Sequence, residues 1–307
     1  MASLKNIKLK IISYKKTGTV THAMEAVSAV KMRKGQERAL SGRSYAAAAL
    51  TVLERLSGTA DVARHPLMKE GTGKACFVIV TSDKGLAGSL NSGVIRKVEA
   101  ELSRTVLDRK DVVIIGLGRR GADYFANRGY DVRAKHENVS DSVSEEQLRV
   151  ITDEILKWHA AGEIGSVYVA YQNFISTFEQ QPTVRQIVPV KPDMMREVIA
   201  GIRPARGKYS PATGTSETSP KIAAYTIEPD ADSVLAVLLP KLLNIAVFHA
   251  LLEAKASEHS ARMVAMKSAT DKAKEMAHNL TRTFNKVRQA AITREVSEIT
   301  SGIEAMK

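Results

Sequence analysis

Cysteine is almost absent from this chain, which has one, Cys76, among 307 residues. A single cysteine cannot form an internal disulfide, so we expect a chain that is kept in a reducing compartment. Cys76 lies in the apolar run 75–80, where a buried small side chain is more common than a reactive thiol. The first residues also lack the apolar stretch of a signal peptide, and we expect none.

Proline is missing from both ends of the chain, because all nine prolines lie between Pro66 and Pro240. Glycine is sparse outside that region as well. Both residues interrupt helices, so their scarcity predicts one long helix at each end. We expect these helices over about residues 3–57 and 232–305, roughly 80 Å and 110 Å long at 1.5 Å per residue.

The sequence also lacks an uninterrupted run of about 18 apolar residues, the minimum for a membrane span. Its most apolar segment, 233–252, contains Pro240, Lys241, Asn244 and His249. A charge near the centre of a membrane span is costly. We therefore interpret this segment as a helix buried in protein.

The C-terminal region carries a heptad repeat, in which apolar or small residues alternate at spacings of three and four. This pattern predicts one seam of a left-handed coiled coil. The seam positions are Leu235, Leu238, Leu242, Ile245, His249, Leu252, Ala256, His259, Met263, Met266, Thr270, Ala273, Ala277, Leu280, Phe284, Val287 and Ala291.

A weaker apolar stripe runs through the N-terminal region. Its members are Ile7, Ile11, Tyr14, Val20, Met24, Val27 and Val30. Neither helix can bury its stripe alone, so we expect the two to pair as a long antiparallel coiled coil.

The middle of the chain alternates between strand-like and helix-like patterns. Apolar, β-branched runs predict strands at 76–82, 112–116, 132–135 and 167–174, with a fifth at 183–190. Helical patterns lie between them at 88–107, 119–127 and 144–161. This order predicts the α/β class, as a Rossmann-like domain with a mostly parallel sheet. Residues 193–220, rich in Pro, Gly, Ser and Thr, are expected to form a flexible loop.

Three regions therefore make up the chain: an N-terminal shaft helix (1–58), an α/β domain (59–230) and a C-terminal shaft helix (231–307). Charge follows the same division. Residues 1–57 hold 11 Lys or Arg against 3 Asp or Glu, and residues 241–307 hold 11 against 7. These two segments account for the whole net charge of +12, so we expect the helical pair to face an acidic partner.

Two turns in the middle region invite a ligand-binding interpretation. The segment 116–121, Gly-Leu-Gly-Arg-Arg-Gly, matches G-x-G-x-x-G and makes an NAD(P)-dependent oxidoreductase one alternative. The match is weak, because it follows the second strand of the domain and no clear acidic residue ends the next strand. A plain tight turn is the favoured interpretation. The turn 81–89 lacks P-loop spacing, and is either a ligand site or a structural turn that caps the following helix.

The remaining chemical signals are weaker. The basic cluster 31–34 makes a nucleic-acid-binding coiled coil a second alternative, but aromatic residues are absent nearby. The seven histidines show no metal-like spacing. We therefore expect neither a metal nor a cofactor, and no nucleic acid.

Four segments carry a more specific signal in a fixed order. They read Thr-His-Ala-Met-Glu-Ala-Val at 21–27 with Lys-Met-Arg at 31–33, Ser-Asp-Lys-Gly-Leu-Ala-Gly at 82–88, Tyr-Thr-Ile-Glu-Pro at 225–229, and a long match at 256–270 that continues at 284–295. Together they resemble the gamma subunits of F-type ATP synthases, of the bacterial type. The chain departs from the family pattern at His22, where lysine is typical, at Ala87, where cysteine is usual, and at Ile227, where an aromatic is usual.

The resemblance implies the central rotor shaft of the enzyme. The two helices would stand inside a ring of three alpha and three beta subunits. The α/β domain would form a foot beside the epsilon subunit and the c-ring. Catalysis would occur in the beta subunits, so the chain is expected to be no enzyme itself. It would couple proton- or sodium-driven rotation of the c-ring to ATP synthesis. We expect a peripheral location on the cytoplasmic face of the bacterial cell membrane, through the complex alone.

The resemblance also assigns partner contacts by position. The residues expected to contact the beta subunits are Met24, Lys31, Arg33, Glu258, Arg262, Gln289 and Thr293. Tyr225 and Glu228 are expected to contact the epsilon subunit or the c-ring. None of these residues is expected to be catalytic. Met24 could instead pack on the second helix, and Gln289 could be a solvated residue.

Overall fold

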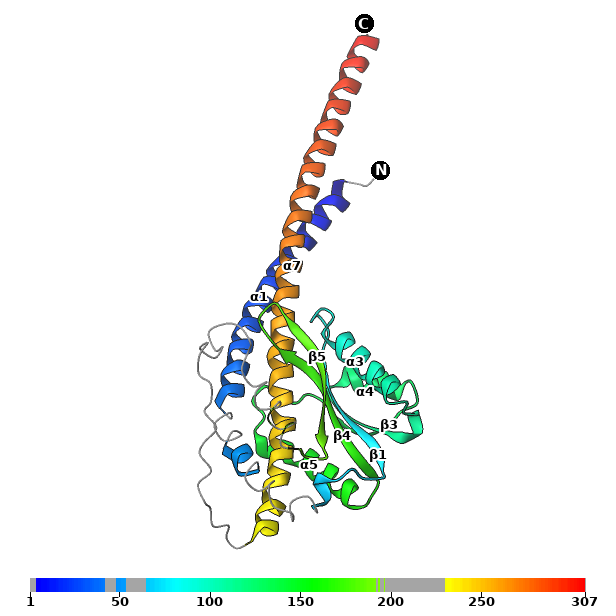
Figure 1. The fold of residues 1–307 in the computed structure, drawn as a ribbon. Coiled ribbons are helices and arrows are strands. Elements are labelled where there is room, and N and C mark those ends of the chain that lie inside the picture. The colour runs from blue at the N-terminus through cyan, green and yellow to red at the C-terminus, as the bar shows by residue number, and fades with distance from the viewer. Residues whose placement is uncertain are drawn as a thin grey trace. The chain divides into compact units, whose positions relative to one another are not determined.

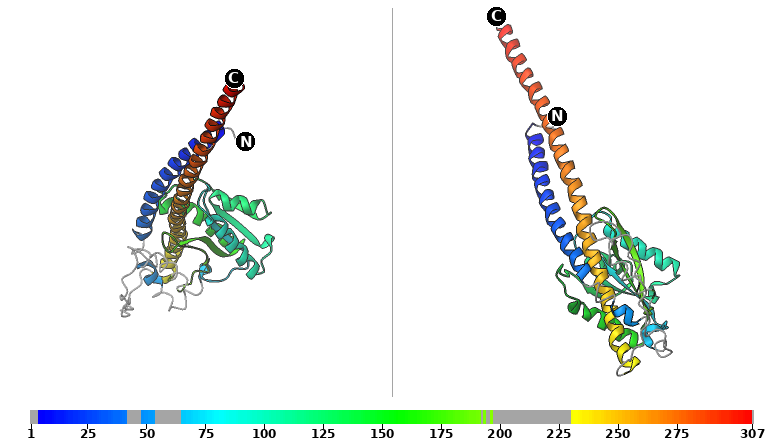
Figure 2. Two further views of the ribbon diagram at one scale, coloured as in Figure 1. Left: turned by 90° about the horizontal axis from the view of Figure 1, so that it is seen from above. Right: turned by 60° about the vertical axis from the view of Figure 1, so that its left-hand side comes forward.

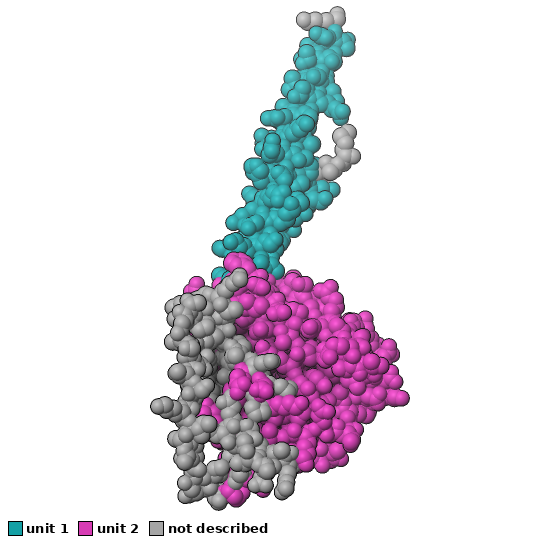
Figure 3. Space-filling view, viewed as in Figure 1, with its two compact units in different colours: residues 1–28, 262–307 teal, residues 29–261 magenta. Residues whose placement is uncertain are grey.

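The computed structural model describes residues 4–41, 48–53, 65–191, 193, 196 and 230–306. The chain forms two compact units, which Figure 3 shows in different colours. Unit 1 holds residues 1–28 and 262–307, and unit 2 holds residues 29–261. The division falls within two long helices, α1 (Leu4–Ser41) and α7 (Ala231–Ala305). Residues 48–53 are also helical.

A five-stranded sheet lies in unit 2, with the order β3-β2-β1-β4-β5. The strands are β1 (Lys74–Val80), β2 (Val112–Leu117), β3 (Asp131–His136), β4 (Ile164–Phe174) and β5 (Gln180–Val188). The first four are mutually parallel, and β4 and β5 form an antiparallel hairpin at one edge. The α/β class and the mostly parallel sheet are therefore confirmed.

Helices cover both faces of this sheet (Figures 1 and 2). They are α3 (Leu90–Arg104), α4 (Arg119–Ala126) and α5 (Glu145–Ala160), with short 3-10 turns at Pro66–Met68 and Arg109–Asp111. Side chains of β1 alternate between the faces, as the pleat requires. Phe77 and Ile79 pack with α3 and α4, whereas Cys76, Val78 and Val80 pack with α5 and α7.

Local sequence explains where α5 begins. Ser144 Oγ accepts a hydrogen bond from Gln147 N, and the Gln147 side chain accepts one from Ser144 N, which makes a capping box. Glu145 and Glu146 then place negative charge in the first turn, and Lys157 and His159 lie in the last turn. Both arrangements complement the helix dipole.

The first part of α7 is a core element of unit 2. Residues 242–247 and 249–254 are buried, and the helix contains Pro240. By length and composition this helix could cross a membrane, but most of its apolar window is buried in protein. The interpretation of residues 233–252 as a buried helix is confirmed.

The element predictions agree closely with the structure. Every predicted strand and middle-region helix lies within three residues of its observed bounds, and α7 begins one residue before its predicted start. The first helix is confirmed over α1, and the rest of its predicted range is only partly described. The 193–220 loop and the segment with Tyr225 and Glu228 lie almost wholly outside the described residues.

The predicted stripe of the first helix is wrong in its second half. Val20, Val27 and Val30 are each more than half exposed, whereas Ile7, at the start of the stripe, is buried. From Gly18 onward the buried side of α1 is made of small or hydroxyl-bearing residues, with one methionine: Gly18, Thr21, Ser28, Met32 and Ala39. A Cβ on Gly18 would lie 3.6 Å from Ala273 Cβ in unit 1, and one on Gly35 would lie 3.5 Å from Ala256 Cβ in unit 2. Helices that approach so closely exclude large side chains from the contact.

The C-terminal seam, by contrast, is confirmed in unit 1. Met266, Thr270, Ala273 and Ala277 are buried at the predicted spacing. Beyond them Leu280 and Phe284 are half-buried.

One carboxyl group is buried in the core of unit 2. Glu253 of α7 is 5% exposed and hydrogen-bonds the Tyr171 hydroxyl of β4, while its Oε2 has no partner among the described residues. Burial raises the pKa of Glu253 to about 8, although Arg185 acts in the opposite direction. One turn earlier, burial lowers the pKa of His249 to about 4. Both side chains are therefore neutral at pH 7.

We predict that Glu253→Gln stabilises the chain increasingly as pH rises. The raised pKa means that the folded state binds more protons than the unfolded state between the ordinary glutamate value and pH 8. The stability of the wild type therefore falls across that interval, by at most roughly 1.4 kcal/mol per pH unit. Glutamine removes this loss. Thermal unfolding of the full chain across this range should show a midpoint difference that grows in favour of the variant.

The matched control is Glu298→Gln, which changes an exposed glutamate on the same helix. It should follow the wild type at every pH. Parallel curves for Glu253→Gln and the wild type would contradict the prediction.

Candidate functional site

The two turns flagged in the sequence meet at the carboxyl ends of β1 and β2. In a nucleotide-binding sheet, the free amides of the helix that starts here would hold a pyrophosphate. In this chain the first three amides of α4 donate to the neighbouring turn instead. The bonds run from Arg119 N to Asp83 Oδ1 (2.9 Å), from Arg120 N to Ser82 O (3.2 Å) and from Gly121 N to Thr81 Oγ1 (2.8 Å). The donors that a pyrophosphate would need are already used.

The glycines of this turn are required by the chain itself. Gly118 has φ +100°, and a Cβ there would lie 1.9 Å from Thr81 O. A Cβ on Gly116 would lie 2.5 Å from Ala122 Cβ. The G-x-G-x-x-G match is thus explained by close packing between β1, β2 and α4. The favoured interpretation as a plain tight turn fits this geometry, and the oxidoreductase alternative has no support.

Asp83 ties three segments together. Besides the α4 amide, its carboxylate accepts a hydrogen bond from Asn138 N, in the loop after β3 (2.9 Å). The turn 81–89 was expected to cap the following helix if it were structural. It caps α4 instead, whereas Ser89, the residue that precedes α3, makes no side-chain cap. The difference arises because β1 and β2 are parallel neighbours, so their carboxyl ends meet. The turn after β1 therefore reaches α4, the helix that follows β2.

The described part of the chain holds no cluster of three or more His, Cys, Asp or Glu that could bind a metal. Cys76 is fully buried in β1, and burial raises the pKa of its thiol to about 12. A thiol in that state is not a nucleophile. Its interpretation as a buried packing residue is therefore supported.

Unit 1 presents a different kind of surface. Within it α1 and α7 pack together through their small residues, and Thr21 Oγ1 and Thr270 Oγ1 form a buried hydrogen bond of 2.7 Å. Leu9, Val20 and Val27 of α1 are more than half exposed. Near the end of α7, Ile292, Val296, Ile299 and Ile303 are likewise more than half exposed. Many of the large apolar side chains of this unit therefore face outward.

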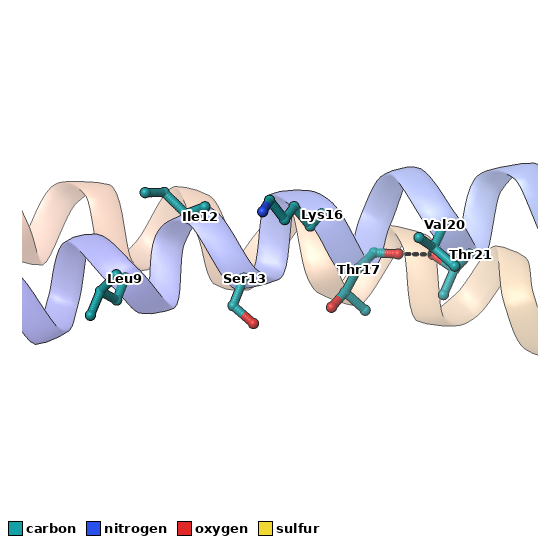
Figure 4. A pocket seen from close by; sticks show the side chains of 7 residues that line it. All are labelled: Leu9, Ile12, Ser13, Lys16, Thr17, Val20 and Thr21. Carbon is teal, nitrogen blue, oxygen red and sulfur yellow. Dashed lines mark hydrogen bonds between the residues drawn. The ribbon is translucent and has the colours of Figure 1, made fainter.

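A depression in this surface follows one side of α1 (Figure 4). Its lining residues are Leu9, Ile12, Ser13, Lys16, Thr17, Val20 and Thr21. The Thr21 hydroxyl donates to the Thr17 carbonyl within the helix. The lining combines three apolar side chains with three hydroxyl-bearing ones, and Lys16 is its one charged residue.

The expected beta-contact residues fall on both units. Met24 and Arg262 are half-buried, Arg33 is exposed and Glu258 is nearly buried. Gln289 and Thr293 are exposed on α7, and the Thr293 hydroxyl donates to the Gln289 carbonyl (3.0 Å).

A polar cluster around Asp141 was missed by the sequence reasoning. Asp141 lies between β3 and α5, and its carboxylate contacts Lys31 Nζ of α1 (2.8 Å) and His259 Nε2 of α7 (3.2 Å). Its main-chain carbonyl accepts a bond from Arg38 (2.7 Å). Hydrogen bonds from His259 and Lys31 hold the pKa of Asp141 well below its usual range. These partners are more than 100 positions away in sequence, so no local pattern could have revealed them.

Comparison with known proteins gives a consistent result. The family model described as ATP synthase matches residues 3–306. The ATP synthase gamma chain of Desulforamulus reducens is 35% identical, that of Geotalea daltonii 37% and that of Staphylococcus saprophyticus 30%, each over the full length of both chains.

Solved structures share the fold at lower identity. A chain in the Euglena gracilis mitochondrial ATP synthase (OSCP/F1/c-ring) matches with TM-score 0.64 and 17% identity, over 99% of this chain and 94% of that one. A chain in the Tetrahymena thermophila mitochondrial ATP synthase (central stalk/c-ring) matches with TM-score 0.59 and 21% identity, over 81% and 99%. These matches support the combination of long helices and a mostly parallel sheet.

We predict that Gly118→Ala destabilises unit 2 by about 3 kcal/mol or more, because the new Cβ meets a backbone carbonyl and the positive φ is strained. Gly129→Ala is the matched control. Gly129 also has a positive φ (+79°), but a Cβ there would meet nothing within 4 Å. It should cost only about 1 kcal/mol. Equal losses in denaturant unfolding would show that the close approach to Thr81 is unimportant.

We also predict that Thr270→Val lowers the stability of the helix pair by about 1 kcal/mol, because it removes the bond to Thr21 while keeping the side-chain volume. Thr283→Val is the control. The Thr283 hydroxyl donates a hydrogen bond to a carbonyl of its own helix, and the residue is exposed. It should change stability by less than about 0.5 kcal/mol. Indistinguishable unfolding midpoints for the two variants would rule out a contribution from the bond between the helices.

Proposed function

Because this chain belongs to the ATP synthase gamma-chain family, we propose that it works as the central rotor shaft, coupling ion-driven rotation of the c-ring to ATP synthesis. It is a non-catalytic stalk subunit, and catalysis takes place in the beta subunits of the complex. As a subunit of this assembly it is peripheral to the membrane.

The observation that carries the proposal is the outward surface of unit 1. A helix pair that acted alone in water would bury its valines and isoleucines and expose its threonines and alanines. Here part of the pair shows the reverse: Thr21 and Thr270 are buried, while Val20 and Val27 are exposed. Such a pair is stabilised by a sleeve of other subunits, which would cover the outward apolar side chains.

The positive charge of the N-terminal segment also supports a surrounding ring of subunits as the partner. The first 57 residues hold 11 Lys or Arg against 3 Asp or Glu. A basic shaft would be attracted to acidic loops on the surrounding beta subunits, and charge pairs that are partly removed from water count for more than solvated ones.

We assign the finer contacts from the family positions. Met24, Lys31, Arg33, Glu258, Arg262, Gln289 and Thr293 would contact the beta subunits. Tyr225 and Glu228 would contact the epsilon subunit or the c-ring. Residues 1–58 and 231–307 would form the shaft and residues 59–230 the foot, on the cytoplasmic face of the bacterial membrane.

We predict that co-expression with the alpha and beta subunits of the same organism yields a complex with one copy of this chain per three alpha and three beta subunits. Multi-turnover Mg-ATP hydrolysis should require the chain. Arg262→Glu should then lower hydrolysis roughly tenfold, because a partly desolvated charge is reversed. Size exclusion followed by an ATPase assay measures both outcomes.

Arg282→Glu provides the control, since it reverses an exposed charge on the same helix. A chain that elutes alone, with hydrolysis unchanged by its presence, would contradict the proposed function. Saturable NAD(P)H binding would then favour the oxidoreductase, and binding to DNA that weakens steeply with salt would favour the nucleic-acid alternative.

A further inference from the structure

Asp141 joins the two long helices to the α/β domain within unit 2. Its carboxylate contacts Lys31 of α1 on one side and His259 of α7 on the other, and Lys255 Nζ of α7 lies 3.8 Å away. Lys255 also donates to the Val139 carbonyl in the same loop (2.9 Å). Three separate segments therefore meet at one side chain.

These contacts are shielded from water to different degrees. The side chain of His259 is 7% exposed and that of Lys255 is 16% exposed, whereas Asp141 and Lys31 are 37% and 49% exposed. Charged hydrogen bonds gain strength where water is excluded, and several bonds to one carboxylate restrain its position. The contacts of Asp141 with α7 are therefore stronger than its contact with Lys31 of α1.

The other side of α7 is also held by hydrogen bonds at this level. Ser257 Oγ donates to the Gln172 carbonyl of β4 (3.0 Å), and Ser260 Oγ donates to the Thr177 carbonyl at the tip of the β4–β5 hairpin (2.5 Å). Between residues 255 and 260 the helix thus makes polar contacts with the α/β domain on both sides. We refer to residues 255–260, with Asp141, as the polar band.

The polar band differs in kind from the core that precedes it. From Leu235 to Ala254, α7 packs mainly through apolar side chains. Apolar packing is non-directional, so it resists turning of the helix only through shape. Hydrogen bonds depend on distance and angle, and a small rotation of α7 would break them. Asn244, earlier in α7, also accepts a hydrogen bond from Thr152 Oγ1 and donates one to the Glu145 carbonyl of α5. The polar band is where such contacts lie on both sides of α7, and there the α/β domain can hold the helix against a turning force.

We propose that Asp141 is a positioning residue that transmits torque between the α/β domain and the two long helices. The inference rests on the rotor function proposed above. Asp141 is suited to this role because it contacts α1 and α7 together, whereas Ser257 and Ser260 hold α7 alone. Its loss would leave the helices in place on the apolar core but would let them twist more easily relative to the domain.

The experiment uses the assembled complex and measures rotor stiffness. A bead is attached to the α/β domain through Val106→Cys, because Val106 is 89% exposed and Cys76 is buried and unreactive. The catalytic ring is fixed to a surface and stalled with a non-hydrolysable ATP analogue. The angular variance of the bead then reports the stiffness of the path between ring and domain. ATP hydrolysis and ATP-driven ion pumping are measured on the same preparations.

Asp141→Asn removes the charge and keeps the size of the side chain. It removes the charge that Lys31 and Lys255 contact and leaves an amide oxygen that can accept only a weaker bond, while the contacts of Ser257 and Ser260 stay. Charge-assisted bonds are roughly twice as strong as neutral ones, so we expect the variance to rise by up to about twofold. Hydrolysis and the number of ions pumped per ATP should both stay near the wild-type values, because a more compliant connection still completes every turn. Asp141→Glu should recover part of the stiffness, which a role in folding alone would not predict.

Asp123→Asn is the matched control. Asp123 forms an ion pair with Lys135 inside the α/β domain (2.6 Å), and no contact with α1 or α7 is recorded for it among the described residues. It should leave the variance unchanged. Lys255→Met is a second test if Asp141→Asn does not assemble, because it removes one contact of the same cluster, and its variance should rise by a smaller factor.

The outcomes separate this inference from the proposed function. A wild-type complex that hydrolyses ATP and pumps ions supports the rotor function. If Asp141→Asn or Lys255→Met then gives the same variance as Asp123→Asn, the torque role of Asp141 is wrong while the rotor function stands. If the wild-type chain neither assembles nor supports hydrolysis, both fail.

Discussion

The close approach of α1 and α7 is the constraint on which the other features of the helix pair depend. Gly18 meets Ala273 in unit 1, and Gly35 meets Ala256 in unit 2. Small or hydroxyl-bearing side chains fill most of such a contact, so larger apolar residues such as Val20 and Val27 point outward. A seam of this kind buries little apolar surface, and the pair gains correspondingly little stability from burial. The outward apolar residues are then a cost to the isolated chain, and in the proposed function a surrounding partner covers them.

Helix α7 packs in two different environments along its length. Its first third is the core of the α/β domain, where residues 242–254 are buried apart from the half-buried Phe248. From Arg262 onward only one seam is buried, in contact with α1. The change occurs across the polar band, where hydrogen bonds from Ser257, His259 and Ser260 replace apolar packing. A single uninterrupted helix thus belongs to a globular domain at one end and to a slender pair at the other.

The sequence predicted what local patterns encode. β-branched runs located all five strands, and heptad spacing located the seam of α7 from Met266 to Ala277. It failed where burial does not follow hydrophobicity: Val20 and Val27 were assigned to the seam of α1, whose buried positions are Thr21 and Ser28. It also failed where partners are distant in sequence. The turn 81–89, if structural, was expected to cap the next helix, and Asp141 was not singled out. The partners of Asp83 and Asp141 are set by the order of strands in the sheet.

The α/β domain shows that a mostly parallel sheet with a glycine-rich turn need not hold a nucleotide. A parallel sheet places turns and helix N-termini at the carboxyl ends of its strands, where ligands usually bind. In this chain the side chains of Thr81 and Asp83 occupy the amides of α4, and Gly118 lets the Thr81 carbonyl approach where a ligand would lie. The glycine pattern therefore persists for internal packing. The fold and the motif are compatible with an enzyme, but the α4 amides are already hydrogen-bonded within the chain. The domain is therefore a non-catalytic part of the complex, and catalysis takes place in the beta subunits.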